Sequence, residues 1–274
     1  MSGVLLTFNF PHKTASMFAW RLAKAISAEN EDWNLYSPNA SPPNHAEALA
    51  DLQSGRTSKA LFAPARRYEG PGSTLVHVTL YRVLQLRDPL DMLVSQYFSH
   101  GWSHPSSRWS ERALEMRLAI SEGKLSVREY CELEIEHGSG FTGSSLVDRI
   151  GSISRQSDPS RDLLLRYEQM VLDYTTWSAR LGNFLTGVGL SCDSLLDCQP
   201  ETLELDPRLK GRFFADPMEY VSEFGIRSGR HIRVGIPGDH RRFLNDYEVD
   251  ELWDLLSERM PDSALLRWSN DGKT

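Results

Sequence analysis

Cysteine is scarce in this 274-residue sequence, and long apolar runs are missing. The three cysteines are odd in number and widely spaced, with no C-x-x-C pair, which argues against a disulfide framework or a zinc site and suits a reducing compartment. No apolar run approaches the ~18 residues that a membrane span needs. The N-terminus lacks a charged segment followed by an apolar core, so we expect no signal peptide. We therefore expect a soluble intracellular protein without a membrane partner, cytoplasmic if the source is bacterial.

Basic charge is also in short supply. The sequence has 30 Lys+Arg against 37 Asp+Glu, a net charge of −7, which argues against a broad footprint for nucleic acid but leaves room for a local basic cluster that binds a small anion. With 40% hydrophobic and 24% charged residues, the composition is that of an ordinary globular protein. Because the expected strands are too few and too evenly spread to demand two domains, we expect one domain over residues 1–274.

Strand-like and helix-like segments alternate along the chain. Short apolar runs of strand length lie at 4–10, 59–64, 81–87 and 162–168. Helical periodicity lies at 16–28, from Asp88-Pro89 onward, and at 108–122, 126–136, 169–187 and 249–260, while 207–247 is mostly loop. This alternation predicts an α/β fold with a central parallel sheet flanked by helices.

The turn after the first strand reads "FPHKTASM" and carries a lysine in front of a helix. Free backbone N–H groups and the positive end of the helix dipole make such a turn a natural phosphate site. Lys13 adds a charge, Thr14 and Ser16 add hydroxyls, and Ala15 is small enough to let an oxyanion approach. An ordinary turn with a solvated lysine and Ser16 as the cap is equally compatible. The glycines of G-x-x-x-x-G-K-[ST] are missing, so a standard ATP or GTP loop is not expected.

Two further stretches carry basic residues. Arg87 ends a strand, at the edge where open α/β sheets bind ligands, and its planar fork can hold a phosphate. Ser95 follows eight residues later in the next helix. The third stretch is "RVGIPGDHRRF" over 233–243, a glycine-rich basic loop. Taken singly, these stretches can also be a surface arginine beside a capping aspartate and a solvated loop.

Together the three stretches resemble the sulfotransferases that use PAPS (3′-phosphoadenosine 5′-phosphosulfate). "KTASM" is similar to the family's K-T-G-T-T, the Arg87-Asp88-Pro89 run with Ser95 to its R-[DN]-P element, and "RVGIPGDHRRF" to R-K-G-x-x-G-D-W-K-N-x-F. "LLLRYEQMVLD" and "SHPSSRW" resemble its Tyr-Glu-Asp strand end and its acceptor-side loop. The resemblance spans nearly the whole chain and implies a P-loop-like sulfotransferase fold and sulfonate transfer from PAPS to a hydroxyl or amine, leaving PAP.

The resemblance also implies roles for individual residues. Lys13 would contact the 5′-phosphate and then the bridging oxygen as the S–O bond breaks. Thr14, Ala15, Ser16 and Met17 would offer hydrogen-bond donors to the 5′-phosphosulfate. The remaining nucleotide contacts would be Arg87 and Ser95 at the 3′-phosphate, Arg233 and the Gly235 N–H closing on it, and Tyr167 near the adenine.

The chain departs from the family at several positions. Met17 replaces a hydroxyl residue, Val234 replaces a lysine and His240 replaces a tryptophan. The family's catalytic histidine has no counterpart in "APARRY" at 63–68. Glu69 is therefore our first candidate for the general base.

Two histidines are the candidate residues on the acceptor side. His100 and His104 are further candidates for the base and are expected to contact the acceptor. We expect no metal requirement and a small-molecule or glycan acceptor, and the sequence leaves the acceptor's identity and the oligomeric state open. Two alternatives remain: a P-loop kinase-like nucleotide enzyme, and a protein that binds PAP or PAPS without turnover.

Overall fold

The computed structural model describes residues 3–11, 13–65, 77–103, 110–138, 145–155, 158, 160–200, 206–225 and 235–260. The chain forms two compact units. The first comprises Met1–Arg87 and Gln156–Thr202, and the second comprises Asp88–Arg155 and Leu203–Thr274. The organisation of residues 1–274 as one domain stays a prediction.

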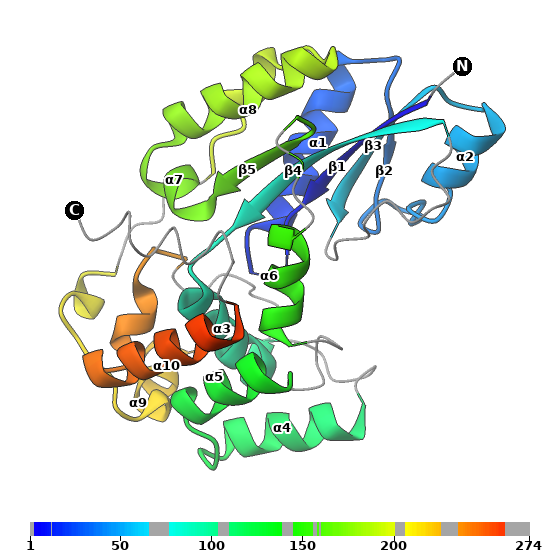
Figure 1. Cartoon of the computed structure of the whole chain (residues 1–274). Helices are drawn as coiled ribbons and strands as arrows, with labels where there is room; N and C mark the ends of the chain where they lie inside the picture. Colours follow the sequence, from blue (N-terminus) through cyan, green and yellow to red (C-terminus); the bar gives the residue numbers. More distant parts are fainter. Residues whose placement is uncertain are drawn as a thin grey trace. The chain divides into compact units, whose positions relative to one another are not determined.

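The first unit contains a five-stranded sheet in which every pairing is parallel, in the order β2-β3-β1-β4-β5 (Figure 1). The strands are β1 (Gly3–Asn9), β2 (Asn34–Tyr36), β3 (Lys59–Ala65), β4 (Val78–Leu86) and β5 (Asp162–Arg166). The central strand β1 is buried over most of its length, as expected of a parallel strand covered on both faces. The predicted central parallel sheet is therefore confirmed.

Helices cover both faces of this sheet. On one face, α1 (Ser16–Glu29), α7 (Tyr167–Leu172) and α8 (Tyr174–Val188) pack over the alternate strand residues Leu6 and Phe8. On the other face, α2 (Ala48–Ser54) packs over Leu5 and its neighbours. Successive residues of β1 thus serve opposite cores, because side chains alternate along a strand.

A buried ion pair joins β4 to β5. The Arg82 guanidinium contacts both carboxylate oxygens of Asp162, and its Nε donates to Oδ1 at 2.5 Å. Both side chains are buried. Such a pair fixes the register of the edge strand, because a slip would leave a charge buried without its partner.

The second unit is helical. Its elements are α3 (Pro89–Phe98), a π-helical turn over Ser99–Ser103, α4 (Glu111–Ser121), α5 (Val127–Glu136), α6 (Leu146–Arg155), α9 (Pro217–Phe224) and α10 (Asp246–Arg259), with 3₁₀ turns at Pro207–Leu209 and Asp239–Arg242. A cluster of aromatic rings fills its core: Tyr97, Phe98, Phe214, Tyr220 and Phe243. In the part of the chain that the structure describes, no helix is long and apolar enough to cross a membrane.

Some predicted boundaries are wrong. The helix expected at 169–187 is two helices, because Asp173 interrupts it and caps α8 by accepting a hydrogen bond from the Thr176 N–H. The strand expected at 162–168 stops at Arg166. The segment 207–247, expected to be mostly loop, contains α9. These errors affect element ends and short elements, not the sheet.

Candidate functional site

The sheet order places the ends of β1 and β4 at a switch point. After β1 the chain continues to β2 and β3 on one side, whereas β5 lies on the other side, beyond β4. Asn9, the last residue of β1, pairs with Leu84, so the segments after these strands leave the same edge of the sheet. Open α/β sheets bind ligands at such a carboxyl edge.

The turn from β1 into α1 has an unusual backbone. Lys13 and Ala15 have φ angles of 72° and 68°, in the left-handed region that non-glycine residues rarely occupy. Ala15 holds the N-cap position and makes no side-chain capping bond, so the Ser16 cap considered from the sequence is not formed. The N–H groups of the first turn of α1 therefore stand at the positive end of the helix with no side-chain cap.

Thr14 closes this turn internally. Its N–H and its Oγ1 both donate to the Pro11 carbonyl, at 3.1 and 2.8 Å, and the side chain is fully buried. In this arrangement the hydroxyl proton is used within the turn, so the donors that the geometry favours are the N–H groups after Thr14. Ser16 is half-buried, and Met17 is exposed with its Sδ 3.6 Å from Asn39 Nδ2.

Gln85 is a site residue that sequence reasoning missed. It is completely buried in β4, where its Nε2 donates to the Thr14 carbonyl at 2.8 Å and its Oε1 accepts from Trp177 Nε1 at 3.2 Å. The available signal was a lone amide in the apolar run "YRVLQLR", two residues before Arg87 and so on the same side of the strand.

Arg87 and Tyr167 meet beside the same turn. Arg87 is only 4% exposed, its Nη1 donates to the Lys13 carbonyl at 3.2 Å, and its Cζ lies 4.4 Å from the centre of the Tyr167 ring. A guanidinium over an aromatic face is stabilised by the ring quadrupole. The first unit thus brings together Lys13, Thr14, Ala15, Arg87 and Tyr167, as expected, and the contact of Tyr167 with adenine stays a prediction.

In the second unit, Asp91 anchors the late glycine-rich loop to α3. Its carboxylate accepts hydrogen bonds from the Gly238 N–H at 2.8 Å, the His240 N–H at 2.9 Å and His240 Nδ1 at 2.9 Å. Asp88 caps α3 by accepting from the Asp91 N–H, with Pro89 in the first turn, as the sequence predicted. These bonds fix His240 and the loop around it against α3.

The contacts of His240 at this anchor shift the pKa of its imidazole. Burial by itself lowers the pKa of His240, but the hydrogen bond to Asp91 and the negative charges of Asp88 and Asp91 outweigh it, so the pKa is raised. The ligand atoms of these three residues lie within 4.8 Å of one another. Two carboxylates and an imidazole suit a divalent cation, yet both Asp91 oxygens already accept N–H bonds, so this arrangement acts as a loop anchor.

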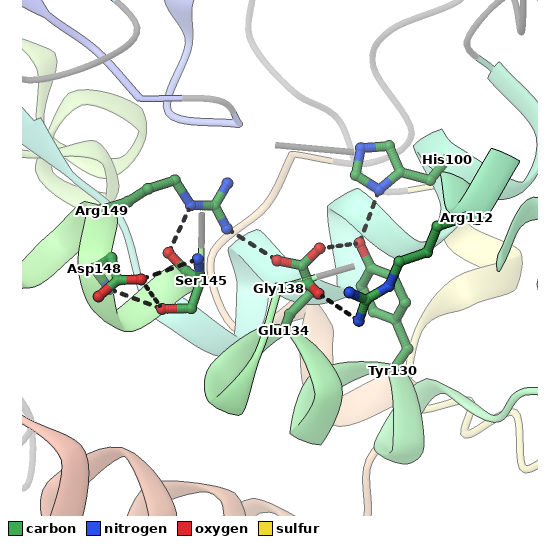
Figure 2. Close-up of polar contacts among 8 residues, drawn as sticks. All are labelled: His100, Arg112, Tyr130, Glu134, Gly138, Ser145, Asp148 and Arg149. Atoms are coloured by element: carbon green, nitrogen blue, oxygen red, sulfur yellow. Dashed lines mark hydrogen bonds and ion pairs between the residues drawn. The ribbon is translucent and has the colours of Figure 1, made fainter. Parts of the chain in front are cut away.

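A chain of buried polar side chains runs behind His100 (Figure 2). His100 Nδ1 lies 2.8 Å from the Tyr130 hydroxyl, Tyr130 donates to Glu134 Oε1 at 3.3 Å, and Arg149 Nη2 donates to Glu134 Oε2 at 3.1 Å. A carboxylate only accepts, so Tyr130 gives its proton to Glu134 and accepts from His100. The neutral imidazole therefore carries its proton on Nδ1. His100 lies in the π-helical turn after α3, not in a loop.

Other predicted residues are placed as follows. Ser95 is half-buried in α3, and Gly235 has a φ of 71°, a conformation that glycine tolerates. Glu69, His104 and Arg233 lie outside the described residues. Their roles, and those of the other candidate residues, stay predictions.

Comparisons with known proteins find similar structures but no similar sequences. No family model and no curated relative matches the sequence. Among solved structures, a mouse sulfotransferase complexed with PAP matches with a TM-score of 0.58 and 14% identity, over 99% of this chain and 89% of that one. Retinol dehydratase with androsterone and inactive cofactor PAP has a TM-score of 0.48 at 14% identity, over 95% of this chain and 81% of that one.

A third comparison involves the sulfotransferase domain of a Synechococcus olefin synthase. It has a TM-score of 0.37 at 15% identity, over 93% of this chain and 94% of that domain. Of these three structures, the mouse protein alone has a TM-score above 0.5 and supports a conclusion about the fold. From that match and the parallel sheet, we conclude that this chain has the α/β fold of the sulfotransferases.

Proposed function

We propose that this protein is a PAPS-dependent sulfotransferase that moves a sulfonate group to a hydroxyl or amine. One observation carries the proposal: at the switch point of a sulfotransferase-fold sheet, one turn holds a lysine and the uncapped N-terminus of α1, and a buried arginine lies beside it. These are the groups that the resemblance assigns to the phosphates of PAPS.

The chemistry of the donor set fits this nucleotide. Backbone N–H groups at a helix N-terminus suit phosphate oxygens. A planar guanidinium suits a terminal phosphate such as the 3′-phosphate. Arg87 is held by the Lys13 carbonyl and the Tyr167 ring, so little side-chain entropy is left to lose on binding. No metal is needed in this account, because lysine, arginine and N–H groups meet the negative charge.

Lys13 and a general base would divide the chemistry. PAPS supplies a sulfonate group attached to a phosphate, which is the leaving group. Lys13 would stabilise the charge that grows on the bridging oxygen as the S–O bond breaks, and this interaction is stronger in the transition state than in the ground state. A base removes the acceptor proton. Glu69, His100 and His104 remain the candidates, and Ser95, Arg233 and Gly235 remain proposed nucleotide contacts.

The proposal includes the class of acceptor, the partners and the cellular location. The acceptor is a small molecule or a glycan, with no nucleic-acid or membrane partner, and the location is cytoplasmic. A P-loop kinase-like enzyme and a binding protein without turnover are the alternatives. The missing glycines before Lys13 count against the first of them.

Thermal unfolding with nucleotides distinguishes a sulfotransferase from a P-loop kinase-like enzyme. PAP in EDTA should raise the unfolding temperature, with a gain of about 2.7 kcal/mol at 100 times its dissociation constant. A shift in unfolding temperature with ATP and magnesium but none with PAP would favour the kinase-like enzyme.

Lys13→Ala should lower turnover by about 100-fold or more while PAP affinity falls much less. Wild-type protein that binds PAP but transfers no sulfonate would be a binding protein.

A further inference from the structure

Gln85 controls the orientation of one peptide group in the phosphate turn. Its Nε2 donates to the Thr14 carbonyl at 2.8 Å. In a trans peptide the C=O and the following N–H point in opposite directions. Holding the Thr14 carbonyl toward β4 therefore turns the Ala15 N–H away from the strand, on the side where the first-turn N–H groups of α1 also point.

The amide of Gln85 is itself fixed in one orientation. The Trp177 indole N–H is donor-only and reaches Gln85 Oε1 at 3.2 Å. The oxygen of the amide must therefore face α8, which leaves the NH₂ group facing the Thr14 carbonyl. A flipped amide would place an oxygen against a carbonyl oxygen and an NH₂ group against an N–H.

The turn needs this support. Ala15 and Lys13 have left-handed φ angles, and for non-glycine residues each such conformation costs about 1–2 kcal/mol. The bonds from Gln85 to Thr14 and from Arg87 to Lys13 hold the two carbonyls within the same turn. Strained residues persist where surrounding contacts over-determine them, and such sites are often functional.

We propose that Gln85 is the positioning residue that aims the Ala15 N–H at the 5′-phosphosulfate, with Trp177 holding Gln85 in the required orientation. This inference rests on the proposed function, because the anion is the nucleotide's. It makes a residue of α8 part of the support for the nucleotide turn. It also explains a fully buried glutamine at this position of β4.

The first test needs no ligand. NMR of ¹⁵N-labelled wild-type protein gives the chemical shift and the hydrogen-exchange rate of the Ala15 amide. Both depend on the direction in which this N–H is held. Gln85→Leu should change both strongly, and Gln53→Leu, at an exposed glutamine of α2, should leave them unchanged. An Ala15 amide that is the same in Gln85→Leu as in wild type would overturn the proposal.

The second test separates positioning from stability. Gln85→Leu should weaken PAP binding about 10-fold or more, the effect of misdirecting a donor to a charged group. Trp177→Phe removes the bond that orients the amide but keeps the NH₂ donor beside the Thr14 carbonyl, so it should weaken PAP binding by a smaller factor than Gln85→Leu. If Trp177→Phe and Gln85→Leu lowered PAP affinity equally for equal losses of stability, Gln85 would be merely structural.

Gln85→Met guards against a folding defect in the leucine variant. It keeps the unbranched shape of the side chain but lacks the NH₂ donor, so PAP binding should fall as in Gln85→Leu. PAP affinity equal to wild type in Gln85→Met would reject the positioning role. Wild-type protein that fails to bind PAP would instead reject the proposed function, whatever the amide measurements show.

Discussion

Removing Arg149 should destabilise the second unit strongly. Its partner Glu134 is completely buried, and the pair is closed by an N–H···O distance of 3.1 Å. Arg149→Met would remove the guanidinium that faces this buried carboxylate, to which the Tyr130 hydroxyl also donates (Figure 2). Breaking a buried pair by removing one partner costs about 3–5 kcal/mol, a large share of the ~5–15 kcal/mol by which domains are stable.

Urea unfolding measures this loss, and two comparisons sharpen it. Adding Glu134→Gln to Arg149→Met should recover part of the loss, since the uncompensated charge is gone. The control is Arg241→Met, whose partner Asp246 has a 92% exposed side chain, and it should cost about 0.5 kcal/mol or less. An Arg149→Met protein within 1 kcal/mol of wild type at neutral pH would refute this reasoning.

Three further predictions concern other parts of the chain. Ala15→Gly should raise the free energy of unfolding by about 0.5–1 kcal/mol, because glycine accepts a left-handed φ, whereas Ala28→Gly in α1 should lower it by a similar amount; a loss at both positions would contradict the backbone found here. Asp162→Ala breaks the buried pair between β4 and β5 and should cost about 3–5 kcal/mol in urea, against almost nothing for the exposed Asp246→Ala. The pKa of His240 is raised, so its stabilisation is complete below about pH 6.5 and is lost as pH rises; the stability advantage of wild type over His240→Gln should therefore shrink between pH 6.5 and 9, and a growing advantage would reverse the sign.

A capping signal in the sequence was used unevenly. α5 was expected at 126–136 and runs from Val127 to Glu136, because Ser126 and Glu129 form a capping box. α9 was missed in a segment rich in glycine, proline and arginine, although Asp216-Pro217 carries the same capping signal as Asp88-Pro89. The short β2 has only three residues, too few for a periodic pattern.

The candidate site was predictable where motifs mark it. Lys13 and Arg87 were named from local patterns and Tyr167 from the family resemblance, and the structure brings the three together at one turn. Gln85 was missed because its role depends on contacts with Thr14 and Trp177, residues far from it in the sequence. The left-handed Ala15 could not be foreseen either, because alanine gives no signal for a positive φ.

The most direct test of the central claim is whether the site distinguishes a 3′-phosphate. Calorimetric titrations in EDTA should show that wild type binds PAP more tightly than adenosine 5′-phosphate. Arg87→Ala should weaken PAP binding by about 10- to 150-fold, from the 1.5–3 kcal/mol of a charged hydrogen bond, and weaken adenosine 5′-phosphate binding far less. Equal losses for the two ligands, or equal wild-type affinities, would contradict the assignment of Arg87 and with it the account of this site.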